Sequence, residues 1–136
     1  MARNKVLDAW AMIAYFQGEP SGGKVNELLK SFSTDPERAG ILMISRVQWG
    51  EILYVFESWY GASRREEVER LMSQMSVDIV ETDAAMTRTA AHFKASAKLP
   101  YVDAFAAALA IQKGAQLVTG DRDFKAVDGK IDILWL

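Results

Sequence analysis

Acidic residues that follow apolar runs are the first candidates for chemistry in this sequence. Asp121 and Asp123 come directly after the apolar run 116–119, and Asp8 closes another run at 5–8. Each can be explained without a catalytic role, because aspartates at strand ends form turns or accept hydrogen bonds from the first N–H groups of a helix. The same residues can also be part of a metal-binding cluster whose other members lie far away in the chain.

Two further acids belong to predicted helices. Asp103 lies in the first turn after Pro100, where a carboxylate suits the helix dipole. Glu51 lies on an apolar helix face, where an unpaired charge is costly. A salt bridge to an arginine or a bound metal ion would satisfy Glu51 equally well, so both explanations stay open. Its neighbours one turn away are Val47, Tyr54 and Val55.

The elements that must position these acids alternate along the chain. Short apolar, β-prone runs predict strands at 5–8, 41–45, 77–81, 116–119 and 131–136. Apolar periodicity predicts helices at 9–17, 24–33, 45–60, 63–75, 84–97 and 100–113. Strands that alternate with helices indicate an α/β fold, a three-layer α/β/α sandwich with a central, mainly parallel sheet. The length predicts a single domain over 1–136, and the pattern leaves the strand order open.

Several helix boundaries have their own signals. Ser63 and Glu66 have the spacing of a capping box, and Thr82 or Asp83 can cap the helix that follows the third strand. Pro100 is expected to begin the alanine-rich helix. The turn-prone pieces 18–23 and 33–40 are expected to be connections, and Gly114 is expected to end the alanine-rich helix.

Composition narrows the class of protein. Half of the residues are hydrophobic (50%) and 25% are charged, as in ordinary soluble globular proteins. No cysteine is present, which excludes disulfides and thiolate metal sites. "MARNKVLDAW" lacks the apolar core of a signal peptide, and no run of about 18 apolar residues occurs, so a cytoplasmic protein is expected. The net charge of -2 neither supports nor excludes binding to nucleic acid. Acidic residues that hold divalent cations can still bind a polyanion through those cations.

The acids become more informative when they are considered together. Ligands of open α/β sheets bind beyond the carboxyl ends of the strands. If the strands at 5–8 and 116–119 are neighbours, the acids can converge at one edge of the sheet. Gathered like charges need compensating cations, and oxygen ligands favour Mg²⁺ or Mn²⁺. The five acids are Asp8, Glu51, Asp103, Asp121 and Asp123.

Such a site suits the hydrolysis of a phosphodiester. One ion can lower the pKa of a bound water, and a second ion about 4 Å away can stabilise the leaving oxygen. No covalent nucleophile is needed, which fits the absence of cysteine and of a convincing Ser–His pair. The lone His92 is interpreted as a packing or surface residue.

At these residues the sequence resembles the PIN domain, and specifically the VapC-type toxins of bacterial toxin–antitoxin pairs. The matching pieces occur in the family's order and at its usual spacings, and they cover nearly the whole chain. They are "VLDAWAMIAYF" with Asp8, "SRVQWGEILYV" with Glu51, "LPYVDAFAAALA" with Asp103, and "LVTGDRDF" with Asp121 and Asp123.

The resemblance implies a metal-dependent endoribonuclease that arrests growth by cutting RNA and is held inactive by a cognate antitoxin. It implies that Asp123 assists, as an outer-sphere ligand or by shaping the loop. Thr119 would hydrogen-bond a carboxylate or a metal-bound water, and Ser45 would do similar supporting work. The metal ligands that it implies are Asp8, Glu51, Asp103 and Asp121.

The resemblance also implies partners. Family members usually form homodimers and larger assemblies with the antitoxin, whose C-terminal segment enters the active-site groove and can present a basic residue to the carboxylates. Trp10 and Trp49 could line that groove, although core packing is the stronger interpretation. Local positive charge must hold the RNA, and Arg122 is the most suggestive cation because it lies between two of the acids. The other cations considered are Arg46, Arg64, Arg65, Lys94, Lys98 and Lys125.

Two alternatives use the same acids differently. Phosphoryl transfer through an aspartyl intermediate would need a second acid two residues after Asp8, where the chain has Trp10. A non-catalytic binding module of PIN or receiver type could have an acidic pocket without turnover. A receiver would want a lysine directly after a late strand, and "LVTGDRDF" supplies none there.

Overall fold

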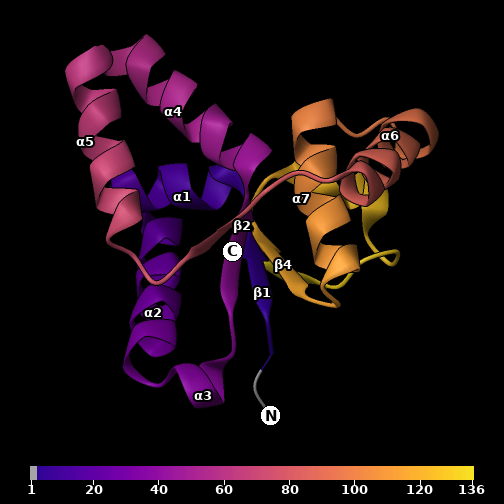
Figure 1. Cartoon of the computed structure of the whole chain (residues 1–136), viewed down its shortest axis with the longest axis horizontal. Helices are drawn as coiled ribbons and strands as arrows, with labels where there is room; N and C mark the ends of the chain where they lie inside the picture. Colours follow the sequence, from indigo (N-terminus) through magenta and orange to yellow (C-terminus); the bar gives the residue numbers. More distant parts are fainter. Residues whose placement is uncertain (1–2) are drawn as a thin grey trace.

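A five-stranded parallel sheet lies at the centre of the protein (Figure 1). The computed structural model describes residues 3–136. Within them the strands follow the order β3-β2-β1-β4-β5, and every neighbouring pair is parallel. The predicted α/β/α class is confirmed, and the strand order that the sequence left open is now defined. The strands are β1 (Lys5–Leu7), β2 (Leu42–Ser45), β3 (Asp78–Val80), β4 (Gln116–Thr119) and β5 (Ile133–Trp135).

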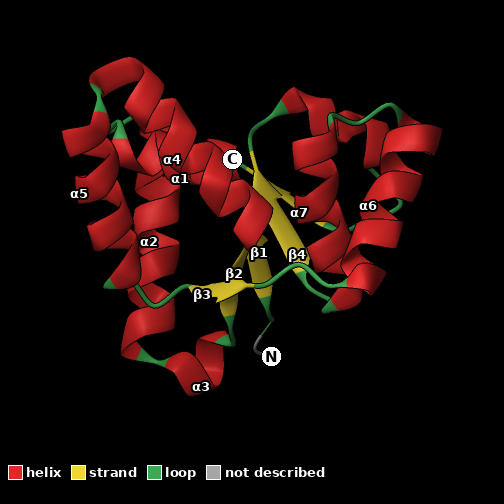
Figure 2. Cartoon of the chain, turned by 45° about the horizontal axis from the view of Figure 1, so that its top comes forward, coloured by secondary structure: helices red, strands yellow, loops and turns green. Residues whose placement is uncertain are grey.

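Helices cover both faces of this sheet (Figure 2). One face carries α1 (Ala9–Phe16), α2 (Pro20–Thr34), α4 (Arg46–Tyr60) and α5 (Ala62–Ser73). The other face carries α6 (Ala84–Ala97) and α7 (Tyr101–Gln112). The short helix α3 (Pro36–Ala39) precedes β2, and the 3-10 helix η1 (Arg122–Val127) follows β4. None of the helices described has both the length and the apolar character needed to cross a membrane.

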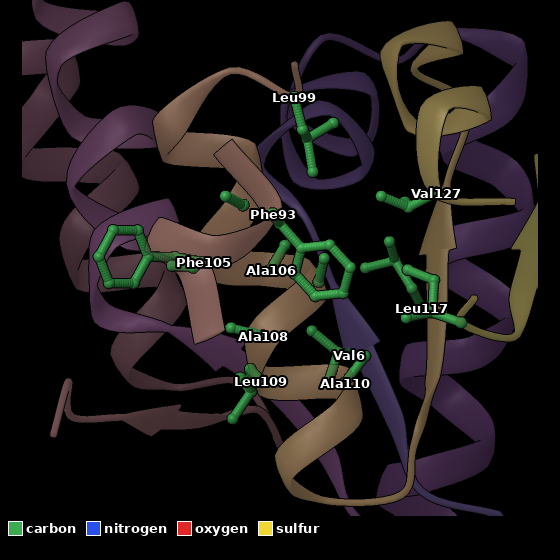
Figure 3. Packing of buried hydrophobic residues seen from close by; sticks show 14 of the residues in the cluster. Val6, Phe93, Leu99, Phe105, Ala106, Ala108, Leu109, Ala110, Leu117 and Val127 are labelled. Carbon is green, nitrogen blue, oxygen red and sulfur yellow. The ribbon is translucent and has the colours of Figure 1, made fainter. Parts of the chain in front are cut away.

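The core consists of two layers, one on each face of the sheet. Successive strand residues point to opposite faces, so Val6 and Leu117 belong to the layer under α6 and α7, while Leu7 and Val118 belong to the other. Figure 3 shows the first layer, in which Phe93 of α6 packs among small side chains of α7. Helix α7 is buried continuously from Asp103 to Ala110. Its small side chains keep it close to the sheet, and this fixes the position of its first turn.

Most predicted helix starts are confirmed. Ser45 caps α4, since its Oγ accepts a hydrogen bond from the N–H of Gln48 at 3.1 Å. Asp83 caps α6 in the same way. Pro100 directly precedes α7. The starts of α4 and α6 depend on local sequence, because each capping side chain and the N–H group that it satisfies are only three residues apart.

Two boundary predictions are wrong. The capping box does not form, because α5 begins at Ala62 and Ser63 lies inside the helix; Gly61, with φ of 91°, occupies the cap position without a side-chain hydrogen bond. The segments 18–23 and 33–40 are not only connections, since α2 begins at Pro20 and α3 lies within the second segment. Proline suits the first position of a helix, where its missing N–H costs nothing.

Gly22 lies where α2 crosses α1, and a Cβ atom there would be 2.5 Å from the carbonyl oxygen of Ala14. We expect Gly22→Ala to lower the free energy of unfolding by about 1–3 kcal/mol, because the clashing atoms are backbone and cannot rotate away. Gly23→Ala is the matched control, since its Cβ would meet no atom within 4 Å. It should raise stability by up to about 1 kcal/mol through helix propensity. Urea unfolding followed by circular dichroism measures both, and equal stability of the two variants would contradict the close crossing.

Candidate metal centre

The site is built where strands β1 and β4 end side by side. The register pairs Leu7 with Val118, so Asp8 and Thr119 are level at the carboxyl edge of the sheet. The sequence prediction required these two strands to be neighbours, and they are. Asp8 also caps α1, because its Oδ1 accepts a hydrogen bond from the N–H of Ala11 at 2.8 Å. The capping role and a place in the site are therefore compatible.

A chain of hydrogen bonds links the acids of β1 and β4. The hydroxyl of Thr119 donates to Oδ2 of Asp8 at 2.5 Å and accepts from the N–H of Asp121 at 2.9 Å. Oδ1 of Asp121 in turn accepts from the N–H of Asp123 at 2.9 Å. Thr119 thus contacts a carboxylate, as one of the two roles implied for it requires. These three hydrogen bonds fix the position of the segment after β4 relative to Asp8.

Three carboxylates converge closely enough to share one ion. One oxygen each from Asp103, Asp121 and Asp123 lies within 4.8 Å of the others. Asp103 is buried, Asp121 is half-buried and Asp123 is exposed, so the cluster extends from the protein interior to solvent. Carboxylate oxygens are the donors that Mg²⁺, Mn²⁺ and Ca²⁺ prefer. The prediction that the last motif and Asp103 come together is confirmed.

Asp8 and Glu51 flank this cluster and interact with it through their charges. Burial raises the pKa of Asp8 to about 8, with smaller contributions from the charges of Asp103 and Asp121, although hydrogen bonds from Thr119 and Ala11 oppose the rise. Because Asp8 is only 1% exposed, burial is the dominant cause. Asp8 is therefore coupled to the cluster without supplying an oxygen to the closest group.

The pKa values of Asp103 and Glu51 are raised for the same reasons as that of Asp8. Burial raises the pKa of Asp103 to about 7, assisted by the charges of Asp121, Glu51 and Asp123. Burial and the charge of Asp121 also raise the pKa of the half-buried Glu51. The charges of the five acids therefore interact with one another, although the acids come from the end of β1, from α4, from α7 and from the start of η1.

No lysine or arginine among the described residues balances these charges. Over residues 3–136, none of the five acids forms a salt bridge with a lysine or arginine. The salt bridge that could have satisfied Glu51 is thus not formed by any described residue. Buried carboxylates without a counter-ion are costly, and a divalent cation would relieve that cost. The donor set therefore fits a divalent metal ion.

Most of the cations considered for RNA binding already have partners. Arg46 pairs with Glu81 and lies 4.5 Å from the ring centre of Trp49. Lys125 lies 4.2 Å from the ring centre of Trp135. Arg64 and Arg65 pair with glutamates of their own helical hairpin. Arg122, Lys94 and Lys98 are exposed and pair with no acid of the described chain, and among these three Arg122 is the one that lies between two acids of the site.

The two tryptophans have different places. Trp49 packs against the core layer of α1, α2, α4 and α5, as the core interpretation predicts. Trp10 is half-buried, and its ring lies against Gly120, just before Asp121. A Cβ on Gly120 would be 2.3 Å from the Cη2 atom of Trp10, so only glycine allows this approach. Trp10 therefore lies beside the acid loop, and the core interpretation does not describe its position.

Gln48 belongs to the surroundings of the site and was missed by sequence reasoning. Its side chain is fully buried and joins the backbones of α1 and α7. One feature of the sequence could have indicated it: Gln48 lies three residues before Glu51, on the same side of the predicted helix. Ser45 is also buried, and its hydroxyl accepts from the N–H of Gln48, so it acts on the acids only through α4.

With this geometry the class of protein can be stated. The sequence model of the PIN domain family matches residues 5–130, and the chain belongs to that family. A comparison with curated proteins gives no significant sequence match.

Solved structures of toxin–antitoxin proteins share this fold along almost the whole chain. VapBC2 from Rickettsia felis, bound to a promoter DNA fragment, has a TM-score of 0.75 at 16% identity and covers 98% of both chains. DNA-bound VapBC from Salmonella typhimurium has a TM-score of 0.72 at 18% identity, again with 98% of both chains covered. VapC20 from Mycobacterium tuberculosis, described as a Sarcin–Ricin loop cleaving toxin, has a TM-score of 0.71 at 17% identity and covers 90% of this chain and 94% of its own. The chain therefore has the VapC fold.

Proposed function

We propose that this protein is a metal-dependent endoribonuclease and the toxin of a toxin–antitoxin pair. The observation that carries the proposal is the set of five acids at the carboxyl edge of the sheet, which form no salt bridge with any described lysine or arginine. Membership of the PIN domain family supports it, and so does the likeness to the fold of a toxin described as cleaving the Sarcin–Ricin loop.

In this proposal the acids hold Mg²⁺ or Mn²⁺. Asp103, Asp121 and Asp123 supply the closest oxygens, and Asp8 and Glu51, whose charges interact with this group, complete the site. The bound ion supplies charge stabilisation for the phosphodiester and makes water a better nucleophile. Asp123, like Asp121, has a carboxylate oxygen within 4.8 Å of those of the other two acids. It is therefore a stronger candidate for direct ligation of the metal than the sequence suggested.

The surrounding residues orient the ligands. Thr119 fixes the carboxylate of Asp8 and the backbone of Asp121 with one hydroxyl, so replacing it would loosen both. Because Asp8 also satisfies an N–H of α1, its carboxylate cannot rotate freely. Ser45 supports Glu51 indirectly, by capping the helix that carries it. Fixed ligands of this kind hold a metal more tightly than mobile ones.

We place the substrate and the partners around this edge of the sheet. Arg122 adjoins Asp121 and Asp123, so its free guanidinium is available for an RNA phosphate. A cognate antitoxin is proposed from the solved VapBC complexes. Homodimer formation, larger assemblies with the antitoxin and a cytoplasmic location complete the proposal.

The alternatives make less use of the site. An aspartyl phosphotransferase needs a second acid two residues after Asp8, and that position holds Trp10 against the acid loop. A non-catalytic binding module would have the acidic pocket but no turnover. A single assay, RNA cleavage by the purified protein, distinguishes the two remaining classes, nuclease and binding module.

The test is RNA cleavage by the purified chain. A labelled RNA mixture is incubated with the protein in Mn²⁺, in Mg²⁺ and in EDTA. We expect cleavage with either ion and a loss of at least about 100-fold in EDTA, since metal catalysis contributes several kcal/mol. Adding excess Mn²⁺ back should restore the rate. Cleavage that persists unchanged in EDTA would refute the metal mechanism, and a folded protein that binds metal without cutting RNA would favour the binding module.

A further inference from the structure

Gln48 connects three segments that carry acids of the site. Its Oε1 accepts a hydrogen bond from the N–H of Ala9 at 2.5 Å, and its Nε2 donates to the carbonyl oxygen of Val102 at 2.6 Å. Ala9 follows Asp8 in the chain and Val102 precedes Asp103, while Glu51 lies three residues after Gln48 on α4. One side chain therefore fastens α1, α4 and α7 together beside their carboxylates.

Only an amide of this length can make both bonds. A carboxylate could accept from Ala9 but could not donate to Val102, and an apolar side chain could do neither. The side chain is 0% exposed, so leaving either backbone group unpaired would carry a full desolvation cost. The N–H of Gln48 is itself held by the hydroxyl of Ser45, which fixes the start of the side chain.

The connection opposes a force that the site creates. Asp8 and Asp103 are both buried, lie on different elements and have no counter-ion among the described residues. Repulsion between ionised acids favours moving α1, α4 and α7 apart. The two hydrogen bonds of Gln48 resist this movement at the residues next to those acids.

We infer that Gln48 is a positioning residue of the metal site, which holds Asp8, Glu51 and Asp103 at the spacing at which a divalent cation binds. The inference rests on the proposed function, because it requires a cation. Gln48 acts through the backbone of Ala9 and Val102, and its side-chain amide also hydrogen-bonds to Asp103, which lowers the pKa of that carboxyl. It therefore orients the acids and is not itself a ligand. A residue with only a packing role would affect stability, whereas a positioning residue must affect metal affinity beyond its effect on stability.

The experiment measures Mn²⁺ binding to the whole purified protein by isothermal titration calorimetry. Gln48→Met keeps the length and burial of the side chain but removes both hydrogen bonds. We expect its dissociation constant for Mn²⁺ to rise by roughly 10- to 100-fold, the usual effect of losing a residue that orients metal ligands. Ile52→Val and Ile52→Ala are the controls, because Ile52 is fully buried on the same helix but has an apolar side chain that forms no hydrogen bond to α1 or α7.

The comparison is made with the control whose melting temperature falls by the same amount as that of Gln48→Met. That control should bind Mn²⁺ with an affinity within twofold of the unmodified protein. If Gln48→Met does not fold, Gln48→Asn replaces it, since the shorter amide stays polar but cannot reach both backbone groups.

The outcomes separate the two proposals. If the unmodified protein binds no Mn²⁺, the proposed function fails. If the unmodified protein binds Mn²⁺ and the Gln48 variant binds it with the same affinity, the metal site stands and the positioning role is overturned. Weaker binding by the variant alone supports both.

Discussion

Asp103→Asn should abolish metal-dependent RNA cleavage and at the same time stabilise the metal-free protein. The first effect follows because the variant removes a charged oxygen from the three-carboxylate cluster. We expect the rate in Mg²⁺ to fall at least about 100-fold, since the metal contributes several kcal/mol to catalysis. The second effect follows because burial and the charges of Asp121 and Glu51 make ionised Asp103 costly. Asparagine has the same shape and no charge.

The stability effect should appear above the raised pKa of Asp103, which is about 7. At pH 8.5 in EDTA, each kcal/mol gained by Asp103→Asn would raise the melting temperature by roughly 3–6 °C for a domain of this size. In saturating Mg²⁺ the order should reverse, because the unmodified protein gains binding energy that the variant lacks. Thermal unfolding in both buffers, beside an RNA cleavage assay, measures these effects.

Glu27→Gln is the control for a charge change alone, because Glu27 is exposed on α2 and outside the acid cluster. It should leave cleavage unchanged and shift the melting temperature only slightly. A destabilised Asp103→Asn that still cleaves RNA would show that Asp103 is a structural residue and that the metal site is assigned wrongly. Such a trade between stability and activity is common where function requires an unfavourable arrangement of charges.

The metal-free protein should lose stability as the pH rises from 5 to 8.5. The pKa of Asp8 is about 8 in the folded state, whereas its ordinary value is 3.8, and Asp103 is raised to about 7. Between the two values of each group the folded protein binds more protons than the unfolded chain, so the free energy of unfolding falls with pH. The contribution of Asp8 is complete below pH 4 and is lost as the pH passes through 8.

Mg²⁺ should remove or reverse this pH dependence. Binding requires ionised carboxylates, so it displaces protons and becomes tighter as the pH rises toward 8. Urea midpoints measured from pH 5 to 8.5, in EDTA and in saturating Mg²⁺, test both statements. The surface acids Glu81 and Asp83 have lowered pKa values, so their contributions are already complete in this range. Stability in EDTA that rises with pH would contradict the burial of uncompensated acids.

Asp8→Asn gives a second check on the same linkage. It should flatten the decline in EDTA, because the group with the most strongly raised pKa no longer titrates. Its capping bond to the N–H of Ala11 can be kept by the amide oxygen, so helix α1 should remain intact. A decline as steep as that of the unmodified protein would assign the pH dependence to other residues.

The sequence was informative wherever the cause is local. Alternation and periodicity predicted the strands and the helices, and the cap at Asp83 could be predicted because donor and acceptor are three residues apart. The convergence of the acids could be predicted because the carboxyl ends of parallel strands lie at the same edge of a sheet. The capping box at Ser63 failed because a matching spacing does not show where the helix begins, and the chain enters α5 through Gly61.

What the sequence could not show depends on contacts between distant segments. The pairing of β1 with β4 was only a condition of the argument for the site, and no local pattern determines it. The role of Gln48 depends on backbone groups 39 and 54 residues away. The position of Trp10 depends on its approach to Gly120, which is visible only once both segments are placed.

The pairing of β1 with β4 also has a consequence for the order of events during synthesis. Lys5 pairs with Leu42 on one side and with Gln116 on the other, so the second side of the first strand waits for a partner more than a hundred residues later. Asp121 and Asp123 emerge from the ribosome more than a hundred residues after Asp8. A growing chain that lacks them has neither the central strand pair nor the three-carboxylate cluster. The proposed nuclease therefore has no assembled acid cluster until the segment 116–123 has been made, and a cognate antitoxin has that interval in which to be ready.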